Sequence, residues 1–381
     1  MGGVSMEFTT YTLGEVCSRL SSGKSIKAAE IFPAGKYPVY GGNGLRGYAD
    51  RSNFEGECAI IGRQGAYCGN VRYFKGEAYM TEHAVVCQAN EKANTYYLSA
   101  LLSTMHLERL SGQSAQPGLA VGTLSVQEIN LPSLEAQRSI ASILSSLDRK
   151  IELNNKINAD LEEMAQSIFK NWFVDFEPFK DGKFVDSELG MIPEGWKVGS
   201  PYEYVKVVYG APYKSAKFND NGEGLPLIRI RDLKDCNPQF YTPEILPQTE
   251  YVNMGDIVAG MDAEFVPHIW KGNTGLLNQR VCKLMPQQTS ISNLFVLYLM
   301  KPELEFVQSY KTGTTVSHLG KADIDKFVVV LPPLEVVEEC SKILDSILQR
   351  IKNISTESRI LSTLRDTLLP RLMSGELEVP E

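Results

Sequence analysis

Leu131-Pro132-Ser133-Leu134-Glu135 returns 200 positions later as Leu331-Pro332-Pro333-Leu334-Glu335. The match continues without a gap to residue 161, so that Ile143, Leu144 and Ile151 correspond to Ile343, Leu344 and Ile351. This period is far too long for a solenoid, whose repeats are about 20 to 50 residues long. The 381-residue chain is therefore predicted to contain two copies of one plan.

Both copies run on into a long, mostly apolar seam. Its positions alternate four and three residues apart from Ile140 to Trp172, and again from Cys340 to Leu372. This period of 3.5 residues is typical of a coiled coil. We predict two helices, each about 38 residues or roughly 57 Å long, that pair antiparallel. The expected pairing side chains are Ile140, Leu144, Leu147, Ile151, Asn154, Leu161 and Ile168, with Leu344, Ile347, Ile351, Ile354, Leu361 and Leu368.

Prolines and a glycine indicate where these helices begin and end. Pro132 and Pro333 lie where a first helical turn tolerates proline, while Glu177-Pro178 and Gly375 should end the helices. Pro370 should kink the last turn of the second helix. The simpler alternative is that each helix only packs on its own globular segment.

Further apolar side chains widen the stripe beyond what two strands of a coiled coil cover. A partner's helices would cover the excess. These apolar positions off the seam are Ile143, Ile157, Met164, Phe169, Phe173, Ile343, Ile360 and Leu364.

Within the seam, the polar Asn154 and Asn158 should restrict the register of the helix pair.

A globular segment precedes each helix. In both segments, short runs of β-branched and aromatic residues between Gly, Asn and Asp predict strands and turns. Lys75-Gly76, five residues and Glu82-His83-Ala84-Val85 match Lys271-Gly272, five residues and Asn278-Gln279-Arg280-Val281. The predicted fold class is α+β: two globular α/β domains joined by two long antiparallel coiled-coil helices, duplicated with pseudo-twofold symmetry. The predicted boundaries are 1–132 (first domain), 133–176 (first helix), 177–195 (linker), 196–333 (second domain), 334–374 (second helix) and 375–381 (tail).

The net charge of −8 disfavours a nucleic-acid partner at first sight. The distribution of charge along the chain matters more than the net charge. Residues 1–133 carry 11 basic and 11 acidic side chains, and residues 196–333 carry 14 of each, so the excess acid lies in the helices, linker and tail. The helices are therefore expected to face water or protein.

Several functional classes lack support in the sequence. Seven cysteines without Cys-x-x-Cys spacing or a secretory leader predict reduced thiols in a cytosolic protein and no structural zinc. No apolar stretch approaches the roughly 20 residues of a membrane span. Gly23-Lys24-Ser25 resembles the end of a phosphate loop, but Ser18 stands where the first glycine belongs. The four histidines are isolated, so we predict no catalytic residue and no metal site.

Some polar loop residues suit contact with DNA. Arg63 and Gln64 lie on a glycine-flanked loop and carry the paired donors that recognise guanine and adenine edges. A solvated loop is the plainer interpretation. Polar stretches at the ends of both globular segments are better placed. The candidate DNA-binding residues are Asn43, Arg63, Gln64, Tyr67, Arg72, Lys75, Gln113, Ser114, Gln116, Lys214, Arg229, Arg231, Lys271, Arg280, Lys311, Thr312 and Thr314.

The chain resembles the specificity subunits of type I restriction-modification systems over nearly its whole length. The Leu-Pro-x-Leu-Glu helix starts carry this resemblance together with several further motifs. These are Tyr37-Pro38-Val39-Tyr40-Gly41-Gly42-Asn43-Gly44, Ile61-Gly62-Arg63-Gln64-Gly65, Phe169-Lys170-Asn171-Trp172-Phe173-Val174-Asp175-Phe176, Gly190-Met191-Ile192-Pro193-Glu194-Gly195-Trp196, Asn278-Gln279-Arg280-Val281 and Leu368-Leu369-Pro370-Arg371-Leu372.

The resemblance implies two target-recognition domains that each read half of a bipartite DNA site. It also implies a helical spacer that docks two methyltransferase subunits. S-adenosylmethionine, ATP and Mg are expected only in partner subunits, including the restriction subunits of a full complex, and this chain is expected to be non-catalytic and cytoplasmic. The alternative is a coiled-coil adaptor with two protein-binding domains.

Two features of the second half depart from the family pattern. The segment from Leu319 to Pro332 is five residues longer than that from Leu124 to Pro132, so the duplication is expected to be imperfect there. The loop Gly260-Met261-Asp262-Ala263 also lacks the arginine of the first loop. A base-contact role therefore does not transfer directly to that position.

Overall fold

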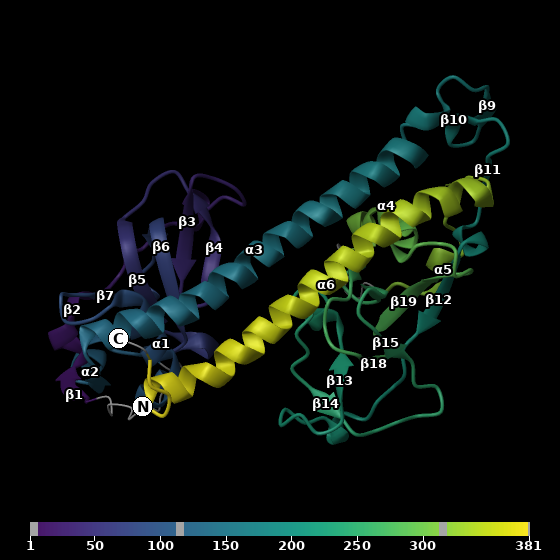
Figure 1. The fold of residues 1–381 in the computed structure, drawn as a ribbon. Helices are drawn as coiled ribbons and strands as arrows, with labels where there is room; N and C mark the ends of the chain where they lie inside the picture. Colours follow the sequence, from purple (N-terminus) through teal and green to yellow (C-terminus); the bar gives the residue numbers. More distant parts are fainter. Residues whose placement is uncertain (1–6, 112–117, 312–317, 380–381) are drawn as a thin grey trace. The chain divides into compact units, whose positions relative to one another are not determined.

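The computed structural model describes residues 7–111, 118–311 and 318–379. The chain divides into two compact units: unit 1 comprises Met1–Ile151 and Leu361–Glu381, and unit 2 comprises Glu152–Ile360. Each unit contains one globular segment and part of both long helices, α3 (Leu134–Phe173) and α6 (Leu334–Met373) (Figure 1). The predicted α+β class with internal duplication and two long helices is confirmed.

Unit 1 is built on a six-stranded sheet in the order β2-β7-β5-β6-β3-β4. Its neighbouring strands are antiparallel except β3 and β6, which are parallel. A separate pair, β1 and β8, joins the first strand to the segment that leads into α3. The elements are β1 (Thr9–Thr12), β2 (Cys17–Ser22), β3 (Tyr37–Gly41), β4 (Gly44–Ala49), β5 (Phe54–Gly62), β6 (Val71–Met80), β7 (Ala84–Ala89), α1 (Thr95–Thr104), α2 (Val121–Ser125) and β8 (Glu128–Leu131).

Both faces of this sheet are covered, which explains its runs of consecutive buried residues. On one face, Ile61 of β5 and Leu98 of α1 share a core with Ile140 and Leu144 of α3 and with Leu372 of α6. The other face carries a smaller cluster that includes Phe54, Ile60 and Met80. The first globular segment is therefore held directly against its part of the helix pair.

Unit 2 has two four-stranded sheets, β12-β19-β16-β17 and β14-β13-β18-β15, and two two-stranded sheets, β9-β10 and β11-β20. Helix α4 packs on β19 and β17. The elements are β9 (Phe184–Ser187), β10 (Gly190–Pro193), β11 (Lys197–Gly199), β12 (Val205–Tyr209), β13 (Leu225–Ile228), β14 (Tyr241–Thr242), β15 (Tyr251–Val252), β16 (Ile257–Gly260), β17 (Pro267–Ile269), β18 (Gly275–Leu277), β19 (Val281–Pro286), α4 (Asn293–Lys311), α5 (Lys321–Ile324) and β20 (Val329–Leu331).

The two units share one topology. The order β12-β19-β16-β17 repeats β2-β7-β5-β6, and β13 is parallel to β18 as β3 is parallel to β6. The long strands β5 and β6 of unit 1 correspond to two short strands each in unit 2, β15 with β16 and β17 with β18. The pair β11-β20 repeats β1-β8 in the same place before the long helix.

The strand registers correct two alignments made from the sequence. Gly62 pairs with Ala84 and Gly260 pairs with Val281, so Ala84 corresponds to Val281 and not to Arg280. The amide of Leu119 donates to the carbonyl of Arg63, and that of Leu319 donates to the carbonyl of Met261. Leu319 therefore corresponds to Leu119, not Leu124, and the expected five-residue excess is wrong. The ungapped repeat begins before α2 and α5.

Within each unit, α3 and α6 lie antiparallel. In unit 2, Asn154 donates to the Glu357 carboxylate over 2.8 Å and Asn158 donates to the Ser355 hydroxyl over 3.1 Å. In unit 1, Arg365 donates to Asp148 over 2.8 Å. Of the expected pairing residues, Ile140, Leu144, Asn154, Leu344, Ile347, Ile351 and Ile354 are buried, and Leu147, Ile151, Leu161, Ile168, Leu361 and Leu368 are half-buried.

The helices also pack on the globular segments, so the two interpretations of the apolar stripe apply together. Phe169 and Phe173 of α3 are buried in the unit 2 core against Phe295 of α4. Other off-seam side chains remain exposed, including Met164 and Ile360. The stripe is thus shared between helix pairing, domain packing and an uncovered remainder.

The helix ends differ in detail from those expected. Helix α3 ends at Phe173, before Glu177-Pro178, and the segment expected to be a linker contains the β9-β10 hairpin. Ile192 of β10 is buried in the unit 2 core. Helix α6 continues through Pro370 to Met373, and Gly375 follows with a positive φ of 75°.

Candidate nucleic-acid interface

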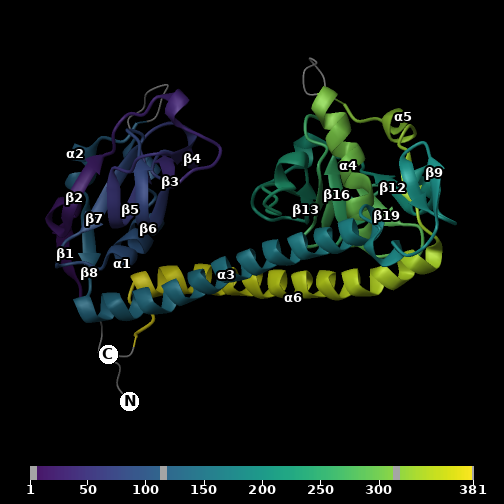
Figure 2. The same cartoon turned by 90° about the horizontal axis from the view of Figure 1, so that it is seen from above.

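One end of the unit 1 sheet gathers several candidate side chains. We call it the unit 1 tip: residues 41–46, 62–72 and 83. A Cβ added at Gly42 would lie 3.0 Å from the carbonyl oxygen of His83 and 3.5 Å from the amide nitrogen of Arg63, and one at Gly44 would lie 3.2 Å from Cζ of Arg72. The β3-β4 turn therefore packs directly on the chain after β5. Gly42 leaves room for this close approach, and Gly44 has a positive φ of 101°, which favours glycine. Figure 2 shows β3 and β4 at the other end of this unit from β1 and β8.

The unit 1 tip presents cationic and amide donors to solvent. Asn43, Gln64, Tyr67 and Arg72 are exposed. Arg63 is half-buried, and its Nη1 lies 3.4 Å from the hydroxyl of Ser22. Burial raises the pKa of the neighbouring Tyr40, and the charge of Arg72 partly opposes this shift. The phenol therefore remains neutral beside the arginine at neutral pH.

Sequence reasoning missed Arg46, which belongs to the unit 1 tip. Its side chain is exposed, and Cδ would lie 2.8 Å from a Cβ at Gly41. No motif marks Arg46, since only the β3-β4 pairing brings it to the glycine turn. A hairpin expectation across Gly41-Gly42-Asn43-Gly44 would have been enough to identify it.

Unit 2 repeats the backbone of this end with different side chains. Gln64 forms an isolated β-bridge with Gly118, and Asp262 forms the equivalent bridge with His318. Arg63 N donates to the carbonyl of His83, as Met261 N does to that of Arg280, each over 2.9 Å. The unit 2 tip therefore consists of residues 229–231, 260–264, 280 and 318.

The unit 2 tip is a network of ion pairs. Nη1 of Arg280 lies 2.5 Å from Oδ2 of Asp262, and Nδ1 of His318 lies 2.7 Å from Oδ1 of the same carboxylate. Arg231 is exposed. It lies three residues after Ile228, as Asn43 lies three after Tyr40, and the carbonyls of Ile228 and Tyr40 accept equivalent bonds from the amides of Asn278 and Thr81. Arg229 instead pairs with the buried Asp232 through Nε at 3.0 Å, and its guanidinium lies over the ring of Phe240. Arg229 is therefore engaged inside the domain.

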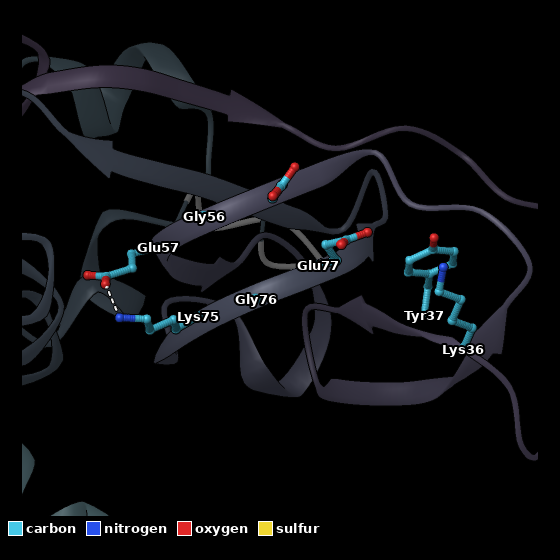
Figure 3. Close-up of a pocket in the computed structure, with 8 residues that line it drawn as sticks. Lys36, Tyr37, Gly56, Glu57, Lys75, Gly76 and Glu77 are labelled. Carbon is cyan, nitrogen blue, oxygen red and sulfur yellow. Dashed lines mark ion pairs between the residues drawn. The ribbon is translucent and has the colours of Figure 1, made fainter.

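Four further candidates are lysines, and one of them, Lys311, reaches the unit 2 tip, where its Nζ donates to the carbonyl of His318 over 2.8 Å. Lys75 pairs with Glu57 over 2.7 Å in a shallow hollow lined by Lys36, Tyr37 and Glu77 (Figure 3). The ammonium groups of Lys271 and Lys311 also pair within unit 2, with Glu162 of α3 and with Asp323, each over 2.7 Å. At Lys214 it is the backbone amide that donates to Glu244, over 2.9 Å.

These contacts fix charge states as well as geometry. Burial opposes ionisation of Asp323, but the Lys311 ammonium and the Gly320 amide outweigh it, so the pKa of this carboxyl is lowered. Lys311 thereby ties the end of α4 to α5. The remaining candidates, Gln113, Ser114, Gln116, Thr312 and Thr314, lie outside the described residues.

Metal-binding clusters and membrane-spanning helices were sought among the described residues. Among residues 7–111, 118–311 and 318–379, no group of three or more His, Cys, Asp and Glu side chains is arranged to hold a metal ion. Over the same residues, no helix has the length and apolar character needed to cross a membrane. The tips supply a set of hydrogen-bond donors and acceptors at the end of a sheet.

Comparison with known proteins agrees with this arrangement. The family model described as type I restriction modification DNA specificity domain matches residues 6–163 and 193–362. The chain belongs to this family. Both matched ranges contain one globular segment and the start of the following helix, so the family domain is the repeated unit identified above.

Curated relatives carry the same description. The chain is 30% identical over 314 residues to the type I restriction enzyme MjaIX specificity subunit of Methanocaldococcus jannaschii, covering 75% of this chain and 69% of that protein. It is 43% identical over 141 residues to the EcoprrI specificity subunit of Escherichia coli, covering 36% of this chain and 35% of that protein. Family membership disfavours the adaptor alternative.

A solved structure shows the same fold. The S subunit of a type I restriction-modification system from M. genitalium aligns over 100% of this chain and 98% of its own, with a TM-score of 0.57 and 16% identity. The similarity at this low identity concerns the fold alone. It agrees with two globular segments, each followed by a long helix.

Proposed function

We propose that this chain selects the DNA target of a type I restriction-modification complex, with each globular domain reading one half of a bipartite site. One observation carries the proposal: the same sheet end occurs twice, with an identical backbone connection and different side chains. The first copy presents Arg63 and Gln64, whereas the second presents Asp262 and Arg280. A repeated backbone that carries different hydrogen-bond donors and acceptors suits two domains that recognise different DNA sequences.

The charge distribution indicates how such reading is supported. Both globular segments are neutral overall, so phosphate attraction is weak outside the tips. Partner subunits are expected to supply further phosphate contacts. DNA binding by the complex should still fall with rising salt, because any neutralised phosphates release counterions.

The long helices are the proposed docking site for two methyltransferase subunits. Exposed apolar side chains along them support this role, because larger exposed apolar surfaces mark sites of protein–protein interaction. They are Leu153 (51% exposed) and Met164 (53%) on α3, and Ile343 (43%), Ile360 (62%) and Leu364 (44%) on α6.

Catalysis is proposed to belong to the partners. Methyltransferase subunits would use S-adenosylmethionine to methylate adenine, and restriction subunits would use ATP and Mg to cleave DNA. This chain would bind double-stranded DNA in the cytoplasm without a cofactor or catalytic residue of its own.

The test is to sequence methylated adenines in DNA from cells that express this chain with its methyltransferase subunit. A second strain carries the chain with residues 1–133 replaced by those of another family member. We expect a bipartite motif in which only one half changes on exchange. A stable complex that produces no motif would contradict the proposal and favour a protein-binding adaptor.

A further inference from the structure

We infer that Arg280 reads a guanine in the half-site recognised by unit 2, with Asp262 as the residue that positions it. This inference rests on the proposed function and adds the base and the side chains that recognise it. From the sequence, Arg280 was a candidate, but a base-contact role did not transfer directly to the 260–263 loop, because Met261 stands where unit 1 has Arg63. The structure shows that a guanidinium reaches the same end of the sheet from the residue before β19.

Arg280 is accessible yet held in place. Its side chain is 55% exposed, while the Asp262 carboxylate that binds Nη1 is 28% exposed. A guanidinium has five N–H donors in a rigid fork, so one bond to Asp262 leaves donors free for two acceptors. Guanine presents two such acceptors, O6 and N7, on its major-groove edge.

His318 completes the arrangement by holding the other carboxylate oxygen. Its Nδ1 lies 2.7 Å from Oδ1 of Asp262. An ionised carboxylate can only accept, so Nδ1 carries the proton in this geometry. Fixed from two sides, Asp262 restricts the rotamers of Arg280 before DNA arrives, which lowers the entropic cost of binding.

The other arginines of the unit 2 tip lack this combination. Arg229 has only 18% side-chain exposure, and Asp232 binds both its Nε and Nη2. Arg231 is exposed, and among the described residues the structure shows no partner that orients its side chain. Arg280 alone among these three is both exposed and fixed by a carboxylate.

Different residues occupy the positions of Asp262 and Arg280 in the unit 1 tip. Gln64 takes the place of Asp262, and His83 takes the place of Arg280. The two tips therefore have no common ion pair, and only unit 2 should respond to changes in the Arg280 network. Substitutions in this network should therefore change the base preference in only one half of the DNA target.

The experiment uses the full chain in complex with its methyltransferase subunit. The complex selects duplexes from a library randomised across the target, and sequencing of the retained DNA gives the base preference at each position. The variants are R280Q, R280K, D262N and R231Q. K326Q serves as the control, because Lys326 is exposed in unit 2 outside the tip and its substitution also removes one positive charge.

We expect R280Q to reduce the preference for one guanine, on either strand of one half-site, by about 10- to 100-fold. R280K should lose most of the same preference, since lysine cannot form the bidentate pair. D262N should weaken it at the same position by a smaller factor, which a merely structural role would not do. K326Q should leave the base preferences unchanged.

Several outcomes would overturn the inference. R280Q and R280K could weaken all sequences equally, which would indicate a phosphate contact. R231Q, and not R280Q, could remove the guanine preference. Alternatively, none of the variants could change the preference for any guanine. If R280Q fails to fold, R280K and D262N decide the question. A wild-type complex without any base preference would instead contradict the proposed function itself.

Discussion

At the scale of single residues, two glycines show how tightly the duplicated frame is built. Gly23 donates to the carbonyl of Ala84 over 3.0 Å, and Gly210 donates to that of Val281 over 3.2 Å, directly after β2 and β12. A Cβ at Gly23 would lie 2.0 Å from the carbonyl oxygen of Met80. At Gly210 it would lie 2.1 Å from that of Asn278. Neither backbone oxygen can move aside without breaking the adjacent strand pairing.

Alanine at either glycine should therefore destabilise the unit that contains it. We expect G23A and G210A each to lower the free energy of unfolding by about 2–3 kcal/mol, measured by urea denaturation. G122A is the matched control: a Cβ there meets no atom within 4 Å, and Gly122 lies in helix α2. Alanine in a helix is favoured over glycine by roughly 0.5–1 kcal/mol, so this variant should be slightly stabilised. Equal losses in all three would contradict the steric explanation.

At the scale of elements, the β9-β10 hairpin is the clearest difference from expectation. Residues 177–195 read as a polar linker, yet Ile192 is only 3% exposed and belongs to the same core as Phe173 and Trp196. Phe173 and Trp196 contact each other with ring centroids 6.0 Å apart. The hairpin therefore covers the end of α3 with an apolar side chain.

Truncation of that side chain should weaken unit 2. I192A is expected to lower the free energy of unfolding by about 2–4 kcal/mol, because a buried isoleucine loses contacts and leaves a cavity. M191A is the control in the same strand, since Met191 is 55% exposed. Its loss should stay within about 0.5 kcal/mol. Similar values for both variants would show that the hairpin does not contribute to the core.

The elements that the sequence predicted well are those whose pattern is local. The 3.5-residue seam requires only the order of apolar residues, and it correctly indicated two long antiparallel helices. Strand registers depend on hydrogen bonds between distant segments. For this reason the ungapped match placed Ala84 one residue away from its true counterpart, Val281.

The candidate DNA-binding residues show the same difference between what local sequence predicts and what depends on contacts between distant segments. Arg63, Gln64 and Arg72 were selected for residue type and loop context, and the structure places them at one tip. Residue type alone could not separate Arg280, which stays exposed, from Arg229, which pairs with the buried Asp232. That distinction depends on the acid each arginine meets after folding, and neither spacing nor composition encodes it.

At the scale of the whole molecule, helix length should determine the gap between the two half-sites. Asp148 bonds Arg365 in unit 1, and Asn154 bonds Glu357 in unit 2. Positions after Ile151 and after Ile360 therefore face each other across the pair. They also coincide with the division between the units. A heptad inserted at both positions preserves the 3.5-residue seam and every described contact within each unit.

Such a double insertion should lengthen the gap without altering either half-motif. Seven residues add about 10 Å of helix, which corresponds to roughly three base pairs at 3.4 Å each. Sequencing of methylated adenines in cells that express the variant with its methyltransferase subunit measures the new gap. Insertion into α3 alone is the control: it displaces Asp148 from Arg365 by two helical turns and should abolish methylation. An unchanged gap after the double insertion would mean that helix length does not set the distance between the two half-sites.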